Sequence, residues 1–245
     1  MLKINKNYRS TYFHESIIKE RVYENGTWHS TVETVQNAVD NNQISNQAVV
    51  FGNGLSRERF DSKLVLNHAG GLLGSTKLQT YGCNAIYRDM AVDFLIASSR
   101  EMALELSSTR YVDTNIVYTG VTNMLEFPKQ FYLIPNDPYA DSGTTAMYIA
   151  AFDGHKKIFM LGFDGQDTTE FNNNVYADTR AYDPSNFTVN DKKWVFNRNE
   201  LISTYDDVDF VWVTETGRCT IPEMLKYNTN FRQISFRDFV LEASL

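Results

Sequence analysis

Two glycines that follow a short apolar run are the residues of this chain best suited to contact a phosphate. Gly52 and Gly54 flank Asn53 directly after the apolar residues 48–51, and Ser56 begins the polar segment that follows. This order is typical of a buried strand, a tight turn that glycine tolerates, and a helix start. In such a turn, backbone N–H groups approach a phosphate with the positive end of the helix dipole behind them. The pattern predicts a nucleotide-binding α/β enzyme, and an ordinary strand–loop turn without a ligand is the alternative.

Other polar residues stand at the ends of predicted strands, where open parallel sheets bind their ligands. Amides supply the donor and acceptor pairs that a base or ribose needs, and a carboxylate suits sugar hydroxyls. A helix start adds unpaired N–H donors. The residues in these positions are Asn84, Ser98, Ser99, Asp164 and Gly165 after strands, and Ser142, Gly143 and Thr144 at a helix start. In the alternative interpretation, the same residues serve as caps, turn formers or strand ends.

Short apolar strands alternate with helices along the chain. Strands are expected at 47–52, 78–84, 93–97, 115–119, 131–135, 157–162 and 208–213. Helices are expected at 30–40, 99–106, 142–152 and 194–205, and residues 63–67 fit a short strand or the end of a helix. Ser142 is expected to cap the helix at 142–152, and Gly154 to end it in a left-handed conformation. The alternation predicts a Rossmann-like α/β fold of three layers with an open, mostly parallel sheet.

The length of 245 residues suits one nucleotide-binding α/β domain over 1–245. Within it, residues 1–46 are expected to form an N-terminal helical segment, and residues 216–245 a C-terminal tail. Residues 165–193 are too many for an ordinary connector and include many acids and scattered tyrosines, which predicts a lid near the site.

Composition limits the partners of the chain. The formal net charge of −7 and the lack of a basic run argue against a nucleic-acid surface. No apolar segment is long enough for a membrane span, so a soluble, cytoplasmic protein is expected. Cys83 and Cys219 form no disulfide framework and no metal-ligand spacing, and Cys83 is expected in the core. Arg57 and Arg59 fit solvated helix residues, with phosphate contacts as the alternative. The oligomeric state stays open, a homo-oligomer included.

Four short motifs occur in an order that resembles family 42 glycosyltransferases, the bacterial sialyltransferases that use a CMP-activated sugar. They are Gly52-Asn53-Gly54-Leu55-Ser56, Gly82-Cys83-Asn84, Ser142-Gly143 before an apolar helix, and Leu161-Gly162-Phe163-Asp164. The resemblance covers residues 47–165, with Leu55 in place of a family proline. The glycine turn and the glycine–helix–strand–aspartate unit are also similar to the 6-hydroxymethylpterin pyrophosphokinase-like family.

The resemblance implies a site that holds the nucleotide phosphate at the glycine turn and the nucleoside with polar residues of the other motifs. Together with the polar strand ends, it assigns nucleotide binding to Gly52, Asn53, Gly54, Ser56, Asn84, Ser98, Ser99, Ser142, Gly143, Thr144, Asp164, Gly165 and Tyr176. Tyr176 lies in the lid, near a family tyrosine that covers the phosphate. The resemblance implies no metal and no other cofactor.

The family's general base, a histidine in or beyond the lid, has no counterpart here, because no histidine follows His155. Glu170, Asp178 and Asp183 are lid carboxylates of the right chemistry to take a proton from an acceptor hydroxyl. The leading hypothesis is a glycosyltransferase that transfers a sugar from a nucleotide-activated donor, a CMP-sugar, to a saccharide acceptor. The alternatives are a pyrophosphokinase-like transferase that uses ATP and magnesium, and a nucleotide-binding protein that has lost its chemistry.

Overall fold

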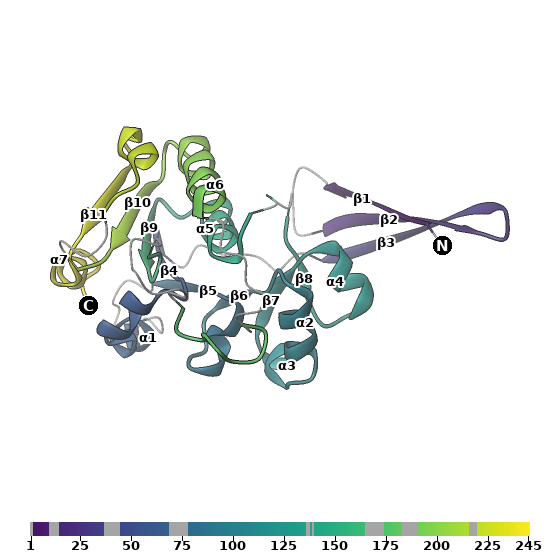
Figure 1. Cartoon of the computed structure of the whole chain (residues 1–245), viewed down its shortest axis with the longest axis horizontal. Coiled ribbons are helices and arrows are strands. Elements are labelled where there is room, and N and C mark those ends of the chain that lie inside the picture. Colours follow the sequence, from purple (N-terminus) through teal and green to yellow (C-terminus); the bar gives the residue numbers. More distant parts are fainter. Residues whose placement is uncertain are drawn as a thin grey trace. The chain divides into compact units, whose positions relative to one another are not determined.

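The computed structural model describes residues 2–9, 15–36, 45–68, 78–135, 138, 140–164, 174–182, 191–215 and 220–245 (Figure 1). The chain divides into two compact units. The first unit comprises Met1–Asn42 and Ala97–Pro138, and the second comprises Gln43–Ile96 and Tyr139–Leu245. That the whole chain acts as one nucleotide-binding domain stays a prediction.

An open eight-stranded sheet with the order β11-β10-β9-β4-β5-β6-β7-β8 confirms the predicted α/β fold class. Six of its strands belong to the second unit: β4 (Gln47–Phe51), β5 (Gln79–Cys83), β6 (Phe94–Ile96), β9 (Lys157–Leu161), β10 (Asp209–Val213) and β11 (Phe231–Ile234). Neighbours among these six pair in parallel. In the first unit, β7 (Ile116–Thr119) and β8 (Tyr132–Leu133) also pair in parallel.

The strand order of the second unit reverses at β4. From β4 the chain continues outward through β5 and β6, whereas β9, β10 and β11 are added on the other side of β4. Phe51 at the end of β4 lies in register with Leu161 of β9 and Gly82 of β5, so the carboxyl ends of three neighbouring strands meet. Open α/β sheets bind their ligands at such a reversal.

Helix α5 (Ser142–Phe152) packs on β4 and β5 and contacts α6 (Asp191–Thr204). All of its residues from Thr144 to Ala151 are buried, which explains why its sequence is apolar on every side. Gly154 follows it with a φ of 96°, which confirms the predicted left-handed end.

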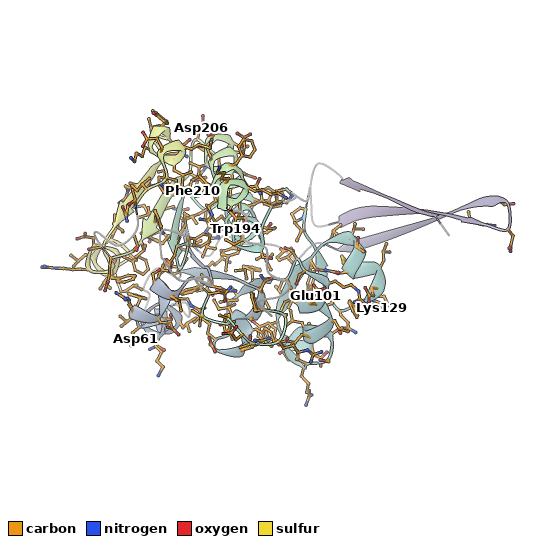
Figure 2. The ribbon with its side chains drawn as sticks, viewed as in Figure 1. Asp61, Glu101, Lys129, Trp194, Asp206 and Phe210 are labelled. Carbon is orange, nitrogen blue, oxygen red and sulfur yellow. The ribbon has the colours of Figure 1, made fainter. Side chains whose placement is uncertain are left out.

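Two shorter helices, α1 (Ser62–His68) and α7 (Phe236–Glu242), complete the second unit. The helical alternative for residues 63–67 is therefore the correct one. The ring of Phe239 in α7 packs 4.8 Å from the ring of Phe159 in β9. Phe210 of β10 is fully buried, whereas Asp206 before that strand is exposed (Figure 2).

The predicted N-terminal helix over 30–40 is wrong. The first unit instead begins with an antiparallel sheet of β1 (Leu2–Arg9), β2 (Glu15–Glu24) and β3 (Thr27–Gln36), so the expected helical segment is a set of strands. Asn25 and Gly26 join β2 to β3 with φ angles of 51° and 82°, the geometry of a two-residue hairpin turn. Residues 31–35 contain four β-branched side chains, which pack well in a strand and lose rotamer freedom in a helix.

The first unit also contains helices α2 (Arg100–Ser107), α3 (Tyr111–Thr114) and α4 (Val121–Glu126). The helix predicted at 99–106 is confirmed as α2. The Ser99 hydroxyl caps it by accepting a hydrogen bond from the Met102 N–H at 3.2 Å. No described helix of either unit is long and apolar enough to cross a membrane.

The expected C-terminal tail is an integral part of the second unit over its described residues 220–245. β11 pairs with β10, and α7 carries Glu242 into contact with Arg232 and Lys157. The hydrogen bond from Arg232 lowers the pKa of Glu242 to about 2, with help from Lys157. Residues 231–242 carry no local sequence signal, and they form an edge strand and a helix because β10 and β9 are there to pack against.

His155 is a buried polar residue directly after the end of α5. Its Nδ1 lies 2.8 Å from the Ser45 carbonyl oxygen, and its Nε2 lies 3.0 Å from the Tyr81 hydroxyl. Burial lowers the pKa of His155 below its ordinary value of 6.5 and outweighs the opposite effect of the Ser45 carbonyl.

We expect this histidine to make the fold less stable in mild acid. As the pH falls through 6.5, His155 in the unfolded chain binds a proton while the native side chain stays neutral. Urea unfolding at about pH 7.5 and about pH 5.5 should therefore show a larger loss of unfolding free energy for wild type than for His155→Gln. An equal loss in both proteins would contradict this assignment, because all other titrating groups are shared.

Candidate functional site

The turns that follow β4 and β9 meet backbone to backbone. The Gly52 N–H donates to the Leu161 carbonyl at 2.7 Å, and the Gly54 N–H donates to the Gly162 carbonyl at 2.9 Å. A Cβ on Gly52 would lie 2.3 Å from the Gly162 carbonyl oxygen, and Gly162 itself has a φ of 71°. Both positions therefore require glycine. The same hydrogen bonds occupy the Gly52 and Gly54 amides, which the sequence offered as phosphate donors.

Asp164 joins the β9 turn to the segment after Gly54. Its Oδ2 accepts from the Ser56 N–H at 2.7 Å, and its Oδ1 accepts from the Ser56 hydroxyl. A Cβ on Gly54 would lie 2.7 Å from this carboxylate, so the close approach depends on glycine here too. Asp164 thus holds the start of the 3₁₀ helix η1 (Leu55–Arg59).

Two asparagine side chains surround the Tyr182 hydroxyl. The Asn53 Nδ2 donates to it at 3.1 Å, and Asn84 at the end of β5 also hydrogen-bonds it. Burial raises the pKa of Tyr182, so this phenol stays protonated. The Oδ1 atoms of Asn53 and Asn84 are buried and have no hydrogen-bond partner among the described residues. Buried acceptors of this kind call for a ligand or a water.

Arg57 is buried, with only 3% of its surface exposed, so its interpretation as a solvated residue is wrong. Its Nη2 donates to the Tyr176 hydroxyl at 3.1 Å, and that hydroxyl donates to Asp89 at 2.6 Å. The Arg57 guanidinium also lies 3.5 Å from the Asp89 carboxylate and 5.4 Å from the centre of the Tyr176 ring. Its Nη1 is buried without a partner in the described structure. Arg59 is exposed and pairs with Glu215 at 2.7 Å.

The start of α5 differs in one detail from the prediction. Asp141, and not Ser142, caps the helix by accepting from the Thr144 N–H at 3.0 Å and from the Thr144 hydroxyl at 2.6 Å. The aspartate is placed one residue before Ser142, where a carboxylate reaches the first-turn amides. The Thr144 amide is therefore taken, whereas Ser142 and Gly143 lie outside this cap. A Cβ on Gly143 would lie 3.3 Å from the Phe163 ring, so this helix start faces the β9 turn.

The middle of the predicted lid, residues 174–182, is hydrogen-bonded to the glycine turn and to the 3₁₀ helix η3 (Asn84–Arg88). The Val175 N–H donates to the Asn53 carbonyl at 2.8 Å. Arg88 donates to the Thr179 hydroxyl at 2.8 Å and to the Arg180 carbonyl at 2.9 Å. Tyr176 and Tyr182 belong to the same segment, which therefore covers Asn53 and Arg57.

The thiol of Cys83 at the end of β5 is buried, and its pKa is shifted. Burial raises the pKa of Cys83 to about 12, and Asp141 raises it further. Arg57 and Arg198 act in the opposite direction. Cys83 is thus an inert core residue, as predicted.

The structure brings together most, but not all, of the predicted site residues. Those that meet around the ends of β9, β4 and β5 are Gly52, Asn53, Gly54, Ser56, Asn84, Ser142, Gly143, Thr144, Asp164 and Tyr176. Ser98 and Ser99 belong to the first unit. Gly165, Glu170, Asp183 and Cys219 lie outside the described residues. Asp178 is exposed in the turn after Tyr176 and has a φ of 60°.

Sequence patterns missed Asp89, Asp141, Tyr182 and Arg198 as neighbours of this site. Only Asp141 carried a local signal, because an aspartate before the start of an apolar helix is a typical cap. The other three come from separate segments and become neighbours through the fold.

Comparisons with known proteins add one distant likeness. No protein-family model matches the chain, and no curated protein matches it in sequence. The structure is similar to the crystal structure of the monofunctional alpha-2,3-sialyltransferase Cst-I from Campylobacter jejuni, with a TM-score of 0.49 and 11% sequence identity. The match covers 79% of this chain and 83% of that chain. At this identity and score, the likeness does not determine what this chain does.

Tyr176→Phe tests the buried cluster of Arg57, Tyr176 and Asp89. We expect the variant to lose about 1–3 kcal/mol of unfolding free energy, because it deprives a buried guanidinium of an acceptor. Tyr227→Phe is the control, since Tyr227 is 77% exposed and its hydroxyl lies 3.4 Å from Glu223. Urea unfolding should change by less than about 0.5 kcal/mol in the control. Equal changes in the two variants would show that the cluster does not stabilise the fold.

Proposed function

We propose that this chain is a glycosyltransferase that binds a CMP-sugar donor at the ends of β9, β4 and β5 and transfers the sugar to a saccharide acceptor. One observation carries the proposal. Asn53 Oδ1, Asn84 Oδ1 and Arg57 Nη1 are buried polar atoms without partners in the described structure; the two asparagines follow the neighbouring strands β4 and β5, and Arg57 lies in η1. The motif order of the sequence, which resembles family 42 glycosyltransferases, supports the choice of a CMP-sugar.

Each of these groups suits one part of the donor. Arg57 is a buried guanidinium with an open donor position, which fits the phosphate that links nucleotide and sugar. The oxygens of Asn53 and Asn84 would accept from the amino group of the base or from ribose hydroxyls. Asp164 would accept from a further ribose hydroxyl, and Ser142 and Gly143 at the start of α5 would contact the base.

Binding would require the segment 174–182 to move, because this segment covers Asn53 and Arg57 and its tyrosines bond the neighbouring atoms, Asn53 Nδ2 and Arg57 Nη2. The predicted lid would therefore open to admit the donor. When it moves, the two tyrosines exchange hydrogen bonds within the chain for hydrogen bonds to the donor. Closure behind the donor would then exclude water from the reacting atoms.

The transfer breaks the bond between the sugar and the phosphate of CMP and forms a bond from the sugar to an acceptor oxygen. Arg57 would stabilise the negative charge that develops on the departing phosphate. A carboxylate of the lid, among Glu170, Asp178 and Asp183, would take the proton of the acceptor hydroxyl. Of these three, Asp178 lies among the described residues, on the exposed side of the turn after Tyr176.

Thermal denaturation with CMP, CDP, UDP, GDP and ATP, each with magnesium and with a chelator, tests the donor. We expect CMP to raise the melting temperature without metal, because a ligand of the native state alone stabilises it by mass action. Asn84→Ala and Asp164→Ala should lose this response, whereas Asn67→Ala, on the exposed face of α1, should keep it. A response to ATP that needs magnesium would favour pyrophosphoryl transfer instead. No response to any nucleotide would overturn the proposal.

Asp178→Asn tests the base. With CMP-N-acetylneuraminate and a galactoside acceptor, we expect transfer to slow about 100-fold while the CMP-induced thermal shift is unchanged. Asp206→Asn, which alters an exposed aspartate before β10, is the matched control. If Glu170→Gln or Asp183→Asn slows transfer instead, the substituted residue is the base. CMP binding without turnover, unaffected by all three substitutions, would identify a nucleotide-binding protein that has lost its chemistry.

A further inference from the structure

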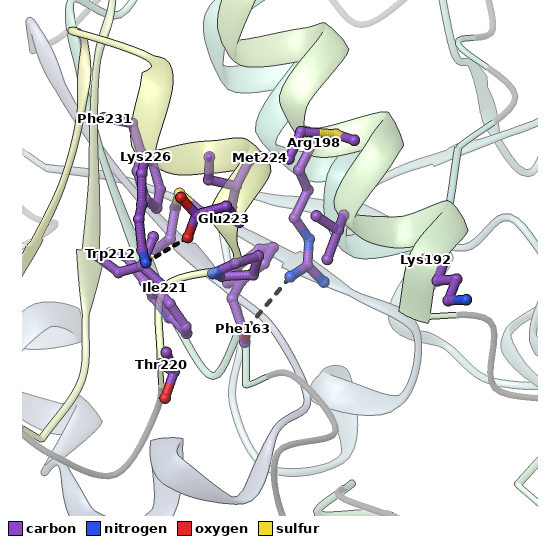
Figure 3. Close-up of a pocket in the computed structure, with 14 residues that line it drawn as sticks. Phe163, Lys192, Arg198, Trp212, Thr220, Ile221, Glu223, Met224, Lys226 and Phe231 are labelled. Atoms are coloured by element: carbon purple, nitrogen blue, oxygen red, sulfur yellow. Dashed lines mark hydrogen bonds and ion pairs between the residues drawn. The ribbon is translucent and has the colours of Figure 1, made fainter.

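A pocket of about 730 Å³ lies on the β9, β10 and β11 side of the second unit (Figure 3). Helix α6, the 3₁₀ helix η5 (Glu223–Tyr227) and the three strands all contribute side chains to it. This volume is typical of sites for small organic molecules. None of the described residues assigned to the CMP-sugar lines it.

Aromatic side chains form much of the pocket wall. Trp212 of β10 and Phe231 of β11 have ring centres 6.5 Å apart, and Phe163 after β9 contributes a third ring. Met160 and Val195 add aliphatic surface. A ligand with a flat apolar body would bury its surface well against such walls.

Two hydrogen-bond donors of the lining have no partner in the described structure. Trp212 is 3% exposed, and its indole Nε1–H donates to nothing. The Nη1 of Arg198 in α6 donates a hydrogen bond to the Phe163 carbonyl at 3.4 Å (Figure 3). The buried Nε of the same side chain has no acceptor among the described residues. An indole N–H and a guanidinium can only donate, so the missing partner must supply acceptor atoms.

The charges of the pocket favour an anion. Arg198, Lys192 and Lys226 line it together with one carboxylate, Glu223. Glu223 pairs with Lys226 at 2.7 Å, and that hydrogen bond lowers the pKa of Glu223 (Figure 3). Among the described lining residues, no further carboxylate balances Arg198 and Lys192.

We propose that this pocket binds a small organic anion with a flat apolar body, whose acidic group accepts hydrogen bonds from Arg198 and Trp212. A carboxylate, sulfonate or phosphate supplies the acceptors, and the apolar body packs against Trp212 and Phe163. The proposal is independent of the proposed glycosyltransferase activity, because the two sets of residues are separate.

The first test compares two probes on the wild-type chain. The anion 8-anilinonaphthalene-1-sulfonate and the neutral N-phenyl-1-naphthylamine share a flat apolar body and differ in charge. We expect one saturable site per chain for the sulfonate, with about tenfold tighter binding than the neutral probe by fluorescence titration. Equal affinity for the two probes would overturn the proposal, because the pocket would then select only for apolar surface.

Two variants locate the site. Arg198→Gln should weaken sulfonate binding about tenfold by removing the charged donor. Met224→Trp, at a lining residue that is 44% exposed, should fill the pocket and abolish binding. Arg237→Gln, on the exposed face of α7, should change nothing.

Circular dichroism melting checks that each variant is folded, and Met224→Trp still decides the question if Arg198→Gln does not fold. Sulfonate binding that is unchanged in both folded variants would overturn the proposal. The CMP-induced thermal shift, measured in Met224→Trp, should be retained, so a failure of the donor site is distinguished from a failure of the pocket.

Discussion

The turns after β4 and β9 touch through their backbones, and much of the second unit depends on that contact. Gly52 and Gly162 approach so closely that a side chain on the former would overlap the carbonyl of the latter. This approach lets Asp164 reach Ser56 and hold the start of η1. η1 in turn directs Arg57 into the protein, next to the residues that follow β5.

Burial of Arg57 sets the second constraint. A guanidinium removed from water needs charge and hydrogen-bond partners, because desolvation of an unpaired cation is expensive. Asp89 and Tyr176 supply part of them at Nη2, and a second nitrogen, Nη1, stays unsatisfied in the described structure. The segment 174–182 is therefore more than a cover. It supplies the Tyr176 hydroxyl as an acceptor for a buried charge, and it can do so only when it lies on the glycine turn.

Phe163 is common to the candidate donor site and to the pocket between α6 and η5. Its ring lies against Gly143 at the start of α5, and it also lines the pocket. Its carbonyl accepts from Arg198, whose guanidinium lies 5.1 Å from the centre of its ring. Phe163 therefore borders both regions, although the residues assigned to the two ligands are different.

Most strands of the eight-stranded sheet, and the position of the candidate site along the chain, follow from local sequence patterns. The strands of the second unit up to β10 are short apolar runs, α5 is an apolar run that ends at Gly154, and the glycine turn follows β4. These signals are local, so they can be read without knowledge of the fold. The helix predicted at 30–40 is wrong although Val32, Val35 and Val39 have helical spacing, because the turn at Asn25 and Gly26 pairs β3 with β2.

Only the tertiary structure decided which polar groups meet. Ser56 and Asp164 are 108 residues apart, Arg57 and Tyr176 are 119 apart, and Asn53 and Tyr182 are 129 apart. No pattern within a short window encodes pairs at such separations, because the partners become neighbours only after parallel strands are aligned. For the same reason the burial of Arg57 and the pocket beside Trp212 could not be predicted: both arise where separate elements pack together.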